Sequence, residues 1–380
     1  MTIETLPARA HAPLLSLQCL RAVASLLVMV HHVAFDGDTI AARTGAASFD
    51  FDRSFDFAFG IHLFFVISGF IMLRTARGFG SLRGATIFLT RRVLRVVPLY
   101  WLLTSLVLVG TAIAPHLLNT PPGGLAVVIG SYLFVPVMRG TGELRPVLGQ
   151  GWTLNYEMFF YALFTLAMLM PRRVAVPALA VTLVGLVALG RAVTPPFAAV
   201  AVWTDSLLLE FLFGIGIALL AERGATASAG MAAVLTGLGC LAAVMLGPIM
   251  PRFDGIAPWA REGLPAALIV AGCVLGPAWH SGRAVVALAL VGDASYSLYL
   301  SHPFAIRLLR SAWLAWAPAV APPAAYLAVA CTAAIALGLL LHRWVERPMT
   351  EWLQRHSWTA GADSRPILPE AAVSEAARVR

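Results

Sequence analysis

Apolar residues are grouped along the chain into runs of roughly twenty, separated by short polar connectors. A helix needs about twenty apolar residues to cross about 30 Å of hydrocarbon, and runs of this length are typical of membrane-spanning helices. The pattern therefore predicts an all-α integral membrane protein with a bundle of about ten transmembrane helices. The predicted spans are residues 14–33, 58–74, 94–114, 153–170, 174–190, 200–221, 231–249, 264–277, 285–303 and 324–343.

One further apolar segment, residues 125–138, is too short for an ordinary span. Pro121-Pro122-Gly123-Gly124 precede it and Gly140 follows it. Turn residues on both sides favour a re-entrant or interfacial segment. If this segment did cross the membrane, every later helix would be inverted.

The charges of the connectors predict the orientation of the bundle. The connector between the second and third spans is rich in arginine and has no acidic residue, whereas the connector before the second span is mostly acidic, with Asp36, Asp38, Asp50, Asp52 and Asp56. Cytoplasmic loops carry the excess of positive charge. The arginine connector is therefore expected in the cytoplasm and, with ten spans, so are both termini.

The same pattern divides the chain into three parts. Residues 1–13 are predicted as a cytoplasmic N-terminal segment, 14–350 as the transmembrane domain and 351–380 as a cytoplasmic tail. The first apolar run lacks a following cleavage site of small residues, so we expect it to remain as the first membrane helix. The tail from about Gly361 has the composition of a disordered segment.

Composition narrows the possible functions. Hydrophobic residues make up 59% of the chain and charged residues 12%, about half the share typical of soluble domains. None of the basic residues is lysine, which excludes catalysis by a lysine amine and a P-loop. The net charge of +8 comes from connectors beside the helices, so nucleic-acid binding is not expected. The four cysteines are widely spaced in apolar runs, and we expect no bound metal.

Arg21 and His32 are polar residues within the first span. A charge inside a membrane helix is costly and marks a functional site by default. Eleven residues at 100° each place His32 on nearly the same face as Arg21, about 16 Å farther toward the outer side. A neutral imidazole there could remove a proton from a hydroxyl group. The structural alternative is a histidine that is bonded to a backbone carbonyl.

Arg91, Arg92 and Arg95 begin the third span, with Arg92 and Arg95 one helical turn apart. Paired arginine forks suit the phosphates of a coenzyme A thioester, and we expect this group to bind the donor at the inner face. Arginines at such a position also act simply as orientation signals that reach lipid phosphates.

Glu157 lies one turn into the fourth span, after Trp152 and with Thr153 as the expected N-cap. His302 lies at the outer end of the ninth span, at the same predicted depth as His32. We expect His302 and Trp152 on the acceptor side, and Glu157 to orient His32 or to stabilise its protonated form. In the second span, Ser68 and Gly69 offer a small-residue contact for another helix. Glu210, buried in the sixth span, needs a partner that the sequence does not identify.

Six motifs in register resemble the acyltransferase-3 family of bacterial membrane acyltransferases over residues 14 to 350. They are Arg21 with His32, Phe64 to Phe70, Arg91 to Pro98, Trp152 to Glu157, Ser295 to His302, and Glu346-Arg347-Pro348. The resemblance is to the exopolysaccharide-modifying branch, which has no attached soluble domain. It departs from the family at His62, where many members have an acidic residue.

The resemblance implies a bacterial inner-membrane enzyme that transfers an acyl group, expected to be acetyl, from cytoplasmic acyl-CoA to a glycan or glycolipid. His32 would be the essential histidine with Arg21 beside it, Arg92 and Arg95 the arginine motif, and no cofactor would be permanently bound. The residues alone leave two alternatives. One is a proton-coupled transporter that uses His32, Glu157 and His302 as a relay, although no pair of interrupted helices supports it. The other is a non-catalytic assembly subunit.

Overall fold

The computed structural model of the chain is a bundle of helices, and the residues that it describes include no strand. These residues are 12–44, 55–113, 123–193, 195, 197–246, 256–279, 282–316 and 323–359. The α-helices are α1 (Ala12–Thr44), α2 (Gly60–Thr75), α3 (Leu82–Ile113), α4 (Leu125–Leu133), α5 (Trp152–Ala167), α6 (Arg172–Ala192), α7 (Ala198–Trp203), α8 (Leu208–Glu222), α9 (Ala229–Leu246), α10 (Leu264–Leu275), α11 (Arg283–Asp293), α12 (Ser295–Trp316), α13 (Pro323–Leu341) and α14 (Arg347–His356). Short 3₁₀ or π turns precede four of them: η3 (Phe57–Phe59), η5 (Gly149–Gly151), η7 (Trp259–Gly263) and η8 (His342–Glu346).

Most residues of the predicted spans are helical, and the chain is a multi-pass helical membrane protein. The predicted sixth span, residues 200–221, is not one unbroken helix, because residues 204–207 lie between α7 and α8. Residue 114 of the third span and residues 247–249 of the seventh lie outside the described residues. Among the described residues, seven stretches are long and apolar enough to cross a membrane, or eight if α11 and α12 form one bent span. Helices α5 and α10 have 16 and 12 residues. At 1.5 Å per residue they cover only about 24 and 18 Å. The count of ten spans is therefore not established by helix length and stays a prediction.

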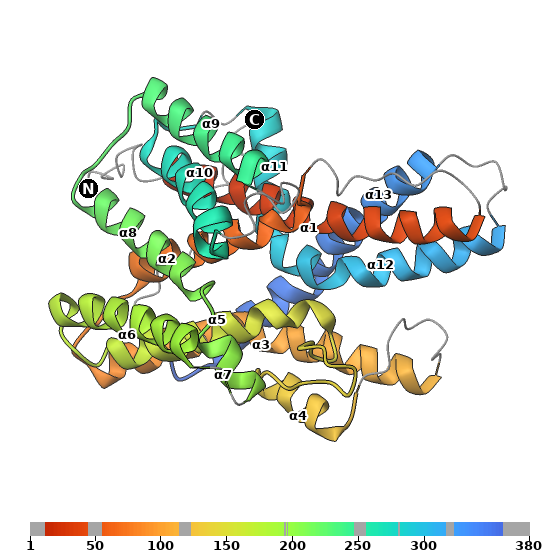
Figure 1. Cartoon of the computed structure of the whole chain (residues 1–380), viewed down its shortest axis with the longest axis horizontal. Helices are drawn as coiled ribbons and strands as arrows, with labels where there is room; N and C mark the ends of the chain where they lie inside the picture. The colour runs from red at the N-terminus through yellow and green to blue at the C-terminus, as the bar shows by residue number, and fades with distance from the viewer. Residues whose placement is uncertain are drawn as a thin grey trace.

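Helix α1 is the central element of the bundle, because it packs against α2, α11, α12 and α13. Figure 1 shows α1 running beside α12, with α13 next to them, while α9 and α10 lie together at one end. The other contacts that matter for the site are those of α2 with α8 and of α3 with α5. Helices far apart in the sequence therefore meet around α1 and α2.

Glycines let α2 and α8 pack with their backbones in contact. A Cβ atom at Gly69 would lie 2.0 Å from the carbonyl oxygen of Phe211, and one at Gly214 would lie 2.0 Å from that of Val66. Any side chain at either position would push the helices apart. The small-residue contact predicted at Ser68 and Gly69 is thus confirmed at Gly69, with α8 as the partner.

The first helix is longer than predicted. The sequence pattern ended it at residue 33 because Asp36 and Asp38 follow, but α1 continues to Thr44. Asp36 is buried and paired: Arg310 Nη1 donates to its Oδ1 over 2.7 Å, and the Tyr326 hydroxyl donates to its Oδ2 over 2.5 Å. Because α12 and α13 supply these partners, the carboxylate does not have to face solvent and the helix does not end.

The predicted ninth span, residues 285–303, is wrong as a single straight helix. It is divided into α11 and α12, whose axes differ by 73° at a break after Asp293. Gln18 of α1 donates to Asp293 Oδ1 over 2.5 Å, which holds the break against the first helix. Helix α12 then runs on to Trp316, so His302 lies well inside a helix rather than at its end.

The predicted short segment, residues 125–138, contains only the nine-residue helix α4. It covers about 14 Å and is too short to cross the membrane alone. Phe134 ends it in the left-handed region with φ 57°. Its re-entrant or interfacial placement stays a prediction.

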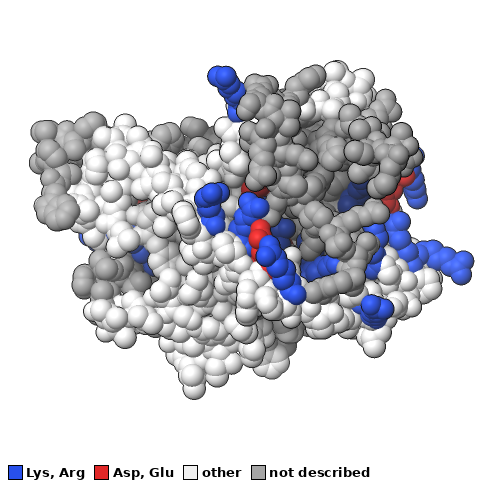
Figure 2. Space-filling model, turned by 180° about the vertical axis from the view of Figure 1, so that it is seen from behind, with Lys and Arg blue, Asp and Glu red and all other residues white. Residues whose placement is uncertain are grey.

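Helix α14 continues past the predicted domain boundary at residue 350, so the start of the predicted tail is helical. Residues 1–11, 45–54 and 360–380, which include most of the predicted N-terminal segment and tail, lie outside the described residues. Figure 2 shows that arginines gather in one part of the face that it displays, while broad areas carry no charge. Arg74, Arg77 and Arg83 of the predicted cytoplasmic connector are exposed.

Candidate functional site

A partly open cavity of about 100 Å³ lies between α1, α2, α3, α5 and α12. Much of its wall is aliphatic or aromatic. The polar residues that line it are Arg21, Ser68, Arg92, Arg95, Thr153, Glu157, Tyr161, Ser295, Tyr296 and Tyr299. It is therefore an apolar pocket with a small number of convergent polar groups, the usual form of a ligand site.

Three arginines reach this cavity. The buried Arg21 donates from Nη1 to Gln18 Oε1 over 3.2 Å, and the buried Arg92 donates from Nη2 to Thr75 Oγ1 over 2.5 Å. Arg95, one turn after Arg92, is half-buried and has no hydrogen-bond partner within the described part of the chain. The cavity thus holds one guanidinium whose donors are available to a ligand, with two more beside it.

Arg91 does not line this cavity. It lies at a smaller pocket with Thr75, Arg77 and Phe88, which Arg92 also lines. The donor group predicted from Arg91, Arg92 and Arg95 is therefore divided, because consecutive residues of α3 point about 100° apart. The third arginine that lines the cavity is Arg21 from α1.

Glu157 is the one carboxylate among the residues that line the cavity. It accepts a hydrogen bond from Ser68 Oγ over 3.2 Å, and another from the hydroxyl of Tyr161, one turn farther along α5. His32 is not among its partners. No contact between Glu157 and His32 is found in the described part of the chain, where Glu157 lines the cavity with the arginines. The pairing of His32 with Glu157 stays a prediction.

His32 meets His302 rather than an acid. The centroids of the two rings lie 4.9 Å apart, with His32 on α1 and His302 on α12. The Nδ1 atom of His32 lies 2.8 Å from the carbonyl oxygen of Val28, and that of His302 lies 3.0 Å from the carbonyl oxygen of Leu298. The backbone-bonded arrangement that the sequence offered as an alternative is thus present, and it occupies only one ring nitrogen.

Tyr299 connects the cavity to the histidine pair. Its ring lines the cavity and lies 6.3 Å from the ring of His302, measured between centroids. The hydroxyl of Tyr299 is bonded to Thr153 Oγ1 over 2.8 Å and to the Gln150 carbonyl over 3.1 Å. The tyrosine is fixed between α12 and α5, and its ring lies near the ring of His302, although neither His32 nor His302 lines the arginine cavity.

Thr153 differs from its predicted role as the N-cap of α5. Helix α5 begins at Trp152 after η5, with Gly151 at the N-cap, so Thr153 is not the cap. The Trp152 ring packs edge-on against Tyr156 at 5.9 Å and does not line the cavity. A role on the acceptor side stays a prediction for Trp152.

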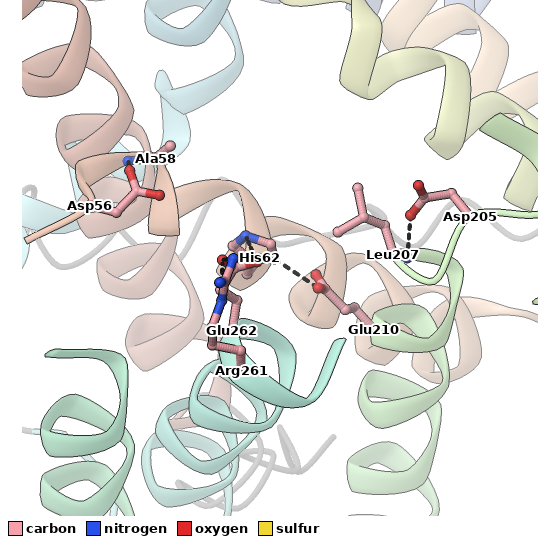
Figure 3. A network of polar contacts seen from close by, with 8 residues as sticks. All are labelled: Asp56, Ala58, His62, Asp205, Leu207, Glu210, Arg261 and Glu262. Atoms are coloured by element: carbon pink, nitrogen blue, oxygen red, sulfur yellow. Dashed lines mark hydrogen bonds and ion pairs between the residues drawn. The ribbon is translucent and has the colours of Figure 1, made fainter. Parts of the chain in front are cut away.

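A second polar cluster joins α2, α8 and η7, and its geometry could not be derived from the sequence. Figure 3 shows His62 between two carboxylates. Its Nδ1 lies 2.7 Å from Glu210 Oε1 and its Nε2 lies 3.2 Å from Glu262 Oε2. Arg261 Nη2 lies 2.9 Å from Glu262 Oε1. A glutamate within an apolar run indicates that Glu210 has a buried partner. That partner is His62, which lies 148 positions away in the sequence. His62 does not line the cavity, and its contacts join α2 to α8 and η7. We therefore interpret this cluster as one that holds helices together.

Within the described residues, no group of three or more histidine, cysteine or acidic side chains is arranged to hold a metal ion.

The comparison with protein families identifies the chain. Residues 14–343 match the acyltransferase domain of the acyltransferase-3 family, which is far more than half of the sequence. The chain belongs to the acyltransferase-3 family. It is therefore an acyltransferase, and the resemblance found in the sequence motifs is confirmed.

A curated relative of this acyltransferase is the exopolysaccharide production protein ExoZ of Rhizobium meliloti (strain 1021). It is 35% identical over 315 residues, which cover 81% of this chain and 94% of the relative. The comparison with solved structures finds no match.

Proposed function

We propose that this acyltransferase moves an acyl group, most simply acetyl, from cytoplasmic acyl-CoA to a hydroxyl group of a cell-envelope or exported glycan. The enzyme would work in the bacterial inner membrane, with His32 as the general base. The relative ExoZ supports a polysaccharide acceptor, because its description is that of an exopolysaccharide production protein.

The observation that carries the proposal is the arginine cavity. Arg21, Arg92 and Arg95 line it together with a single carboxylate, so positive charges outnumber negative ones in an apolar pocket. Guanidinium groups bind phosphate oxygens through paired N–H donors, and a low-dielectric surrounding strengthens the attraction. The pocket suits the phosphates and the thioester carbonyl of acyl-CoA.

His32 supplies the base. A carbonyl oxygen can only accept, so the contact with Val28 requires the hydrogen of the neutral ring on Nδ1. The Nε2 atom is left with a lone pair and has no partner within the described residues. It can take the proton of a glycan hydroxyl as the oxygen attacks the thioester carbonyl carbon. The new C–O bond replaces the C–S bond, and the proton leaves with the coenzyme A thiolate to give the ester and free thiol.

The histidines lie beyond the cavity on the side predicted to face outward. We propose that the phosphates of the donor stay near Arg92 and Arg95, while the acyl end reaches past Tyr299 to His32. This arrangement joins a cytoplasmic donor to an acceptor on the far side. The family match favours this enzyme over the transporter and the assembly subunit, for which the site gives no separate support.

The purified protein in lipid nanodiscs tests the proposal with acetyl-labelled acetyl-CoA and polysaccharide from the host cell, stripped of its esters by mild base. We expect label to move to the polysaccharide as a base-labile ester with wild-type protein and not with His32→Ala. His356→Ala, an exposed histidine on α14, is the matched control. Label that never leaves coenzyme A in the presence of this acceptor would contradict the proposal.

A further inference from the structure

His302 is a buried histidine with an unused ring nitrogen. The residue is fully buried, and its Nε2 atom has no hydrogen-bond partner among the residues that the structure describes. A buried polar atom without a partner costs free energy and calls for an explanation. The neighbour that can supply one is His32, whose ring centroid is 4.9 Å away.

The hydrogen positions of both rings follow from their backbone contacts. His302 Nδ1 must donate to the carbonyl of Leu298, just as His32 Nδ1 donates to that of Val28. In the neutral state each ring therefore carries a bare lone pair on Nε2. Two lone pairs cannot bond to each other, but they can share one proton. When His32 becomes protonated at Nε2, its N–H gains an acceptor in His302.

In the described part of the chain, the charged groups nearest to His32 would not stabilise its protonated form. The charged groups that act on it through space are Arg145, before η5, and Arg307 on α12, and both are cations. The neighbouring titratable ring on its own helix is His31, whose centroid lies 5.3 Å from that of His32 and whose Nδ1 lies 4.0 Å from Asp56 Oδ1. No carboxylate contacts His32 within the described residues. A positive charge on His32 therefore needs a hydrogen-bond acceptor, and two charged rings at once are disfavoured.

We propose that His302 is a positioning residue for the acyl transfer, whose Nε2 accepts a hydrogen bond from protonated His32. The idea rests on the proposed function, in which His32 is the base. It gives His302 the role that the sequence suggested for Glu157. The proton taken from the glycan hydroxyl stays shared between the two Nε2 atoms until it leaves with the thiolate, and no further reactant is needed.

Two substitutions separate this role from simple packing. His302→Asn places an amide near the position of Nδ1, so it keeps a donor for the Leu298 carbonyl and removes the Nε2 acceptor. His302→Gln places an amide oxygen near the position of Nε2, so it restores an acceptor that cannot itself take the proton. Hydrogen bonds to charged groups predict a rate loss of about ten- to a hundredfold for His302→Asn.

The test measures single-turnover acetyl transfer as a function of pH for wild type, His32→Ala, His302→Asn and His302→Gln in nanodiscs, with acetyl-CoA affinity and thermal unfolding as folding controls. We expect His302→Asn to be slow, with the acidic limb of its rate profile moved to lower pH, because protonated His32 has lost its acceptor. We expect His302→Gln to recover most of the rate. A His302→Asn protein with the wild-type rate and profile, or a His302→Gln protein as slow as His302→Asn, would overturn the inference. An active His32→Ala protein would instead overturn the proposed function.

Discussion

The rings of His32 and His302 lie 4.9 Å apart, although 270 positions separate the residues in the sequence. They meet because α12 does not end at His302 but continues beside α1 to Trp316. Each ring donates to the carbonyl oxygen four residues earlier, so both present Nε2 as a free acceptor. The pair is the feature on which our account of proton transfer depends.

Changes at His32 and Glu157 should act independently. Glu157 is bonded to Ser68 and Tyr161, and among the described residues it shares no hydrogen-bond partner with His32. Sites without shared partners usually have additive energies. We expect the rate losses of His32→Gln and Glu157→Gln to multiply in the double variant to within about twofold. Single-turnover acyl transfer by the four proteins measures this, and a double variant no slower than the slower single variant would show that the two act as one unit.

Arg95 should control donor affinity, whereas Arg91 should not. Arg95 lines the cavity with Arg21 and Arg92, while Arg91 lies at a different pocket. Arg95→Lys keeps the charge and loses the planar fork, so we expect acetyl-CoA binding to weaken several-fold. Arg91→Lys is the matched control and should bind like wild type. Equal affinities of both variants, measured by titration of nanodiscs, would return Arg95 to the role of an orientation signal.

His62 should be required for stability. Removing one partner of a buried ionic group leaves uncompensated charge and costs about 3–5 kcal/mol. His62→Ala would leave Glu210, which is fully buried, without its hydrogen bond to the ring. We expect a clearly lower midpoint in thermal unfolding, which can be followed by tryptophan fluorescence in detergent. His356→Ala on the exposed face of α14 should unfold like wild type, and so would His62→Ala if the cluster were not structural.

The arginine connector between α2 and α3 should face the cytoplasm. Single cysteines at Ser81, which is exposed, and at Ser48, outside the described residues, can report this in a protein without its native cysteines. An impermeant thiol reagent added to intact cells should label the cysteine at 48 and spare the one at 81, because arginine-rich loops stay inside. The opposite labelling pattern would show that the predicted orientation of the bundle is wrong.

Much of the fold could be predicted because hydrophobic runs of helical length are a local signal. Most residues of the predicted spans are helical, and the predicted contact at Gly69 is confirmed. The helix ends were harder, because they depend on partners from elsewhere in the chain. The sequence pattern predicts a helix end before Asp36, but Arg310 and Tyr326 bind its carboxylate and the helix continues.

The sequence indicates which polar residues lie near the cavity better than it indicates which of them contact one another. Helical spacing correctly placed Arg92 and Arg95 on one cavity. Equal depth in the membrane suggested His32 with Glu157, but depth says nothing about which helices are neighbours around the bundle. The partner of His32 lies on α12 and that of Glu210 on α2. The order of helices around the bundle is set by tertiary packing, which the local pattern of a single sequence does not reveal.

The ester content of the exported polysaccharide tests the central claim most directly. Cells that lack the gene would be complemented with wild type, His32→Ala or His356→Ala at matched membrane levels, and esters released by mild base would be quantified. A general base is worth about a hundred- to ten-thousandfold in rate. We predict that wild type and His356→Ala restore the esters, and that His32→Ala leaves them at the level of the gene deletion. Full ester content in the His32→Ala cells would contradict the account.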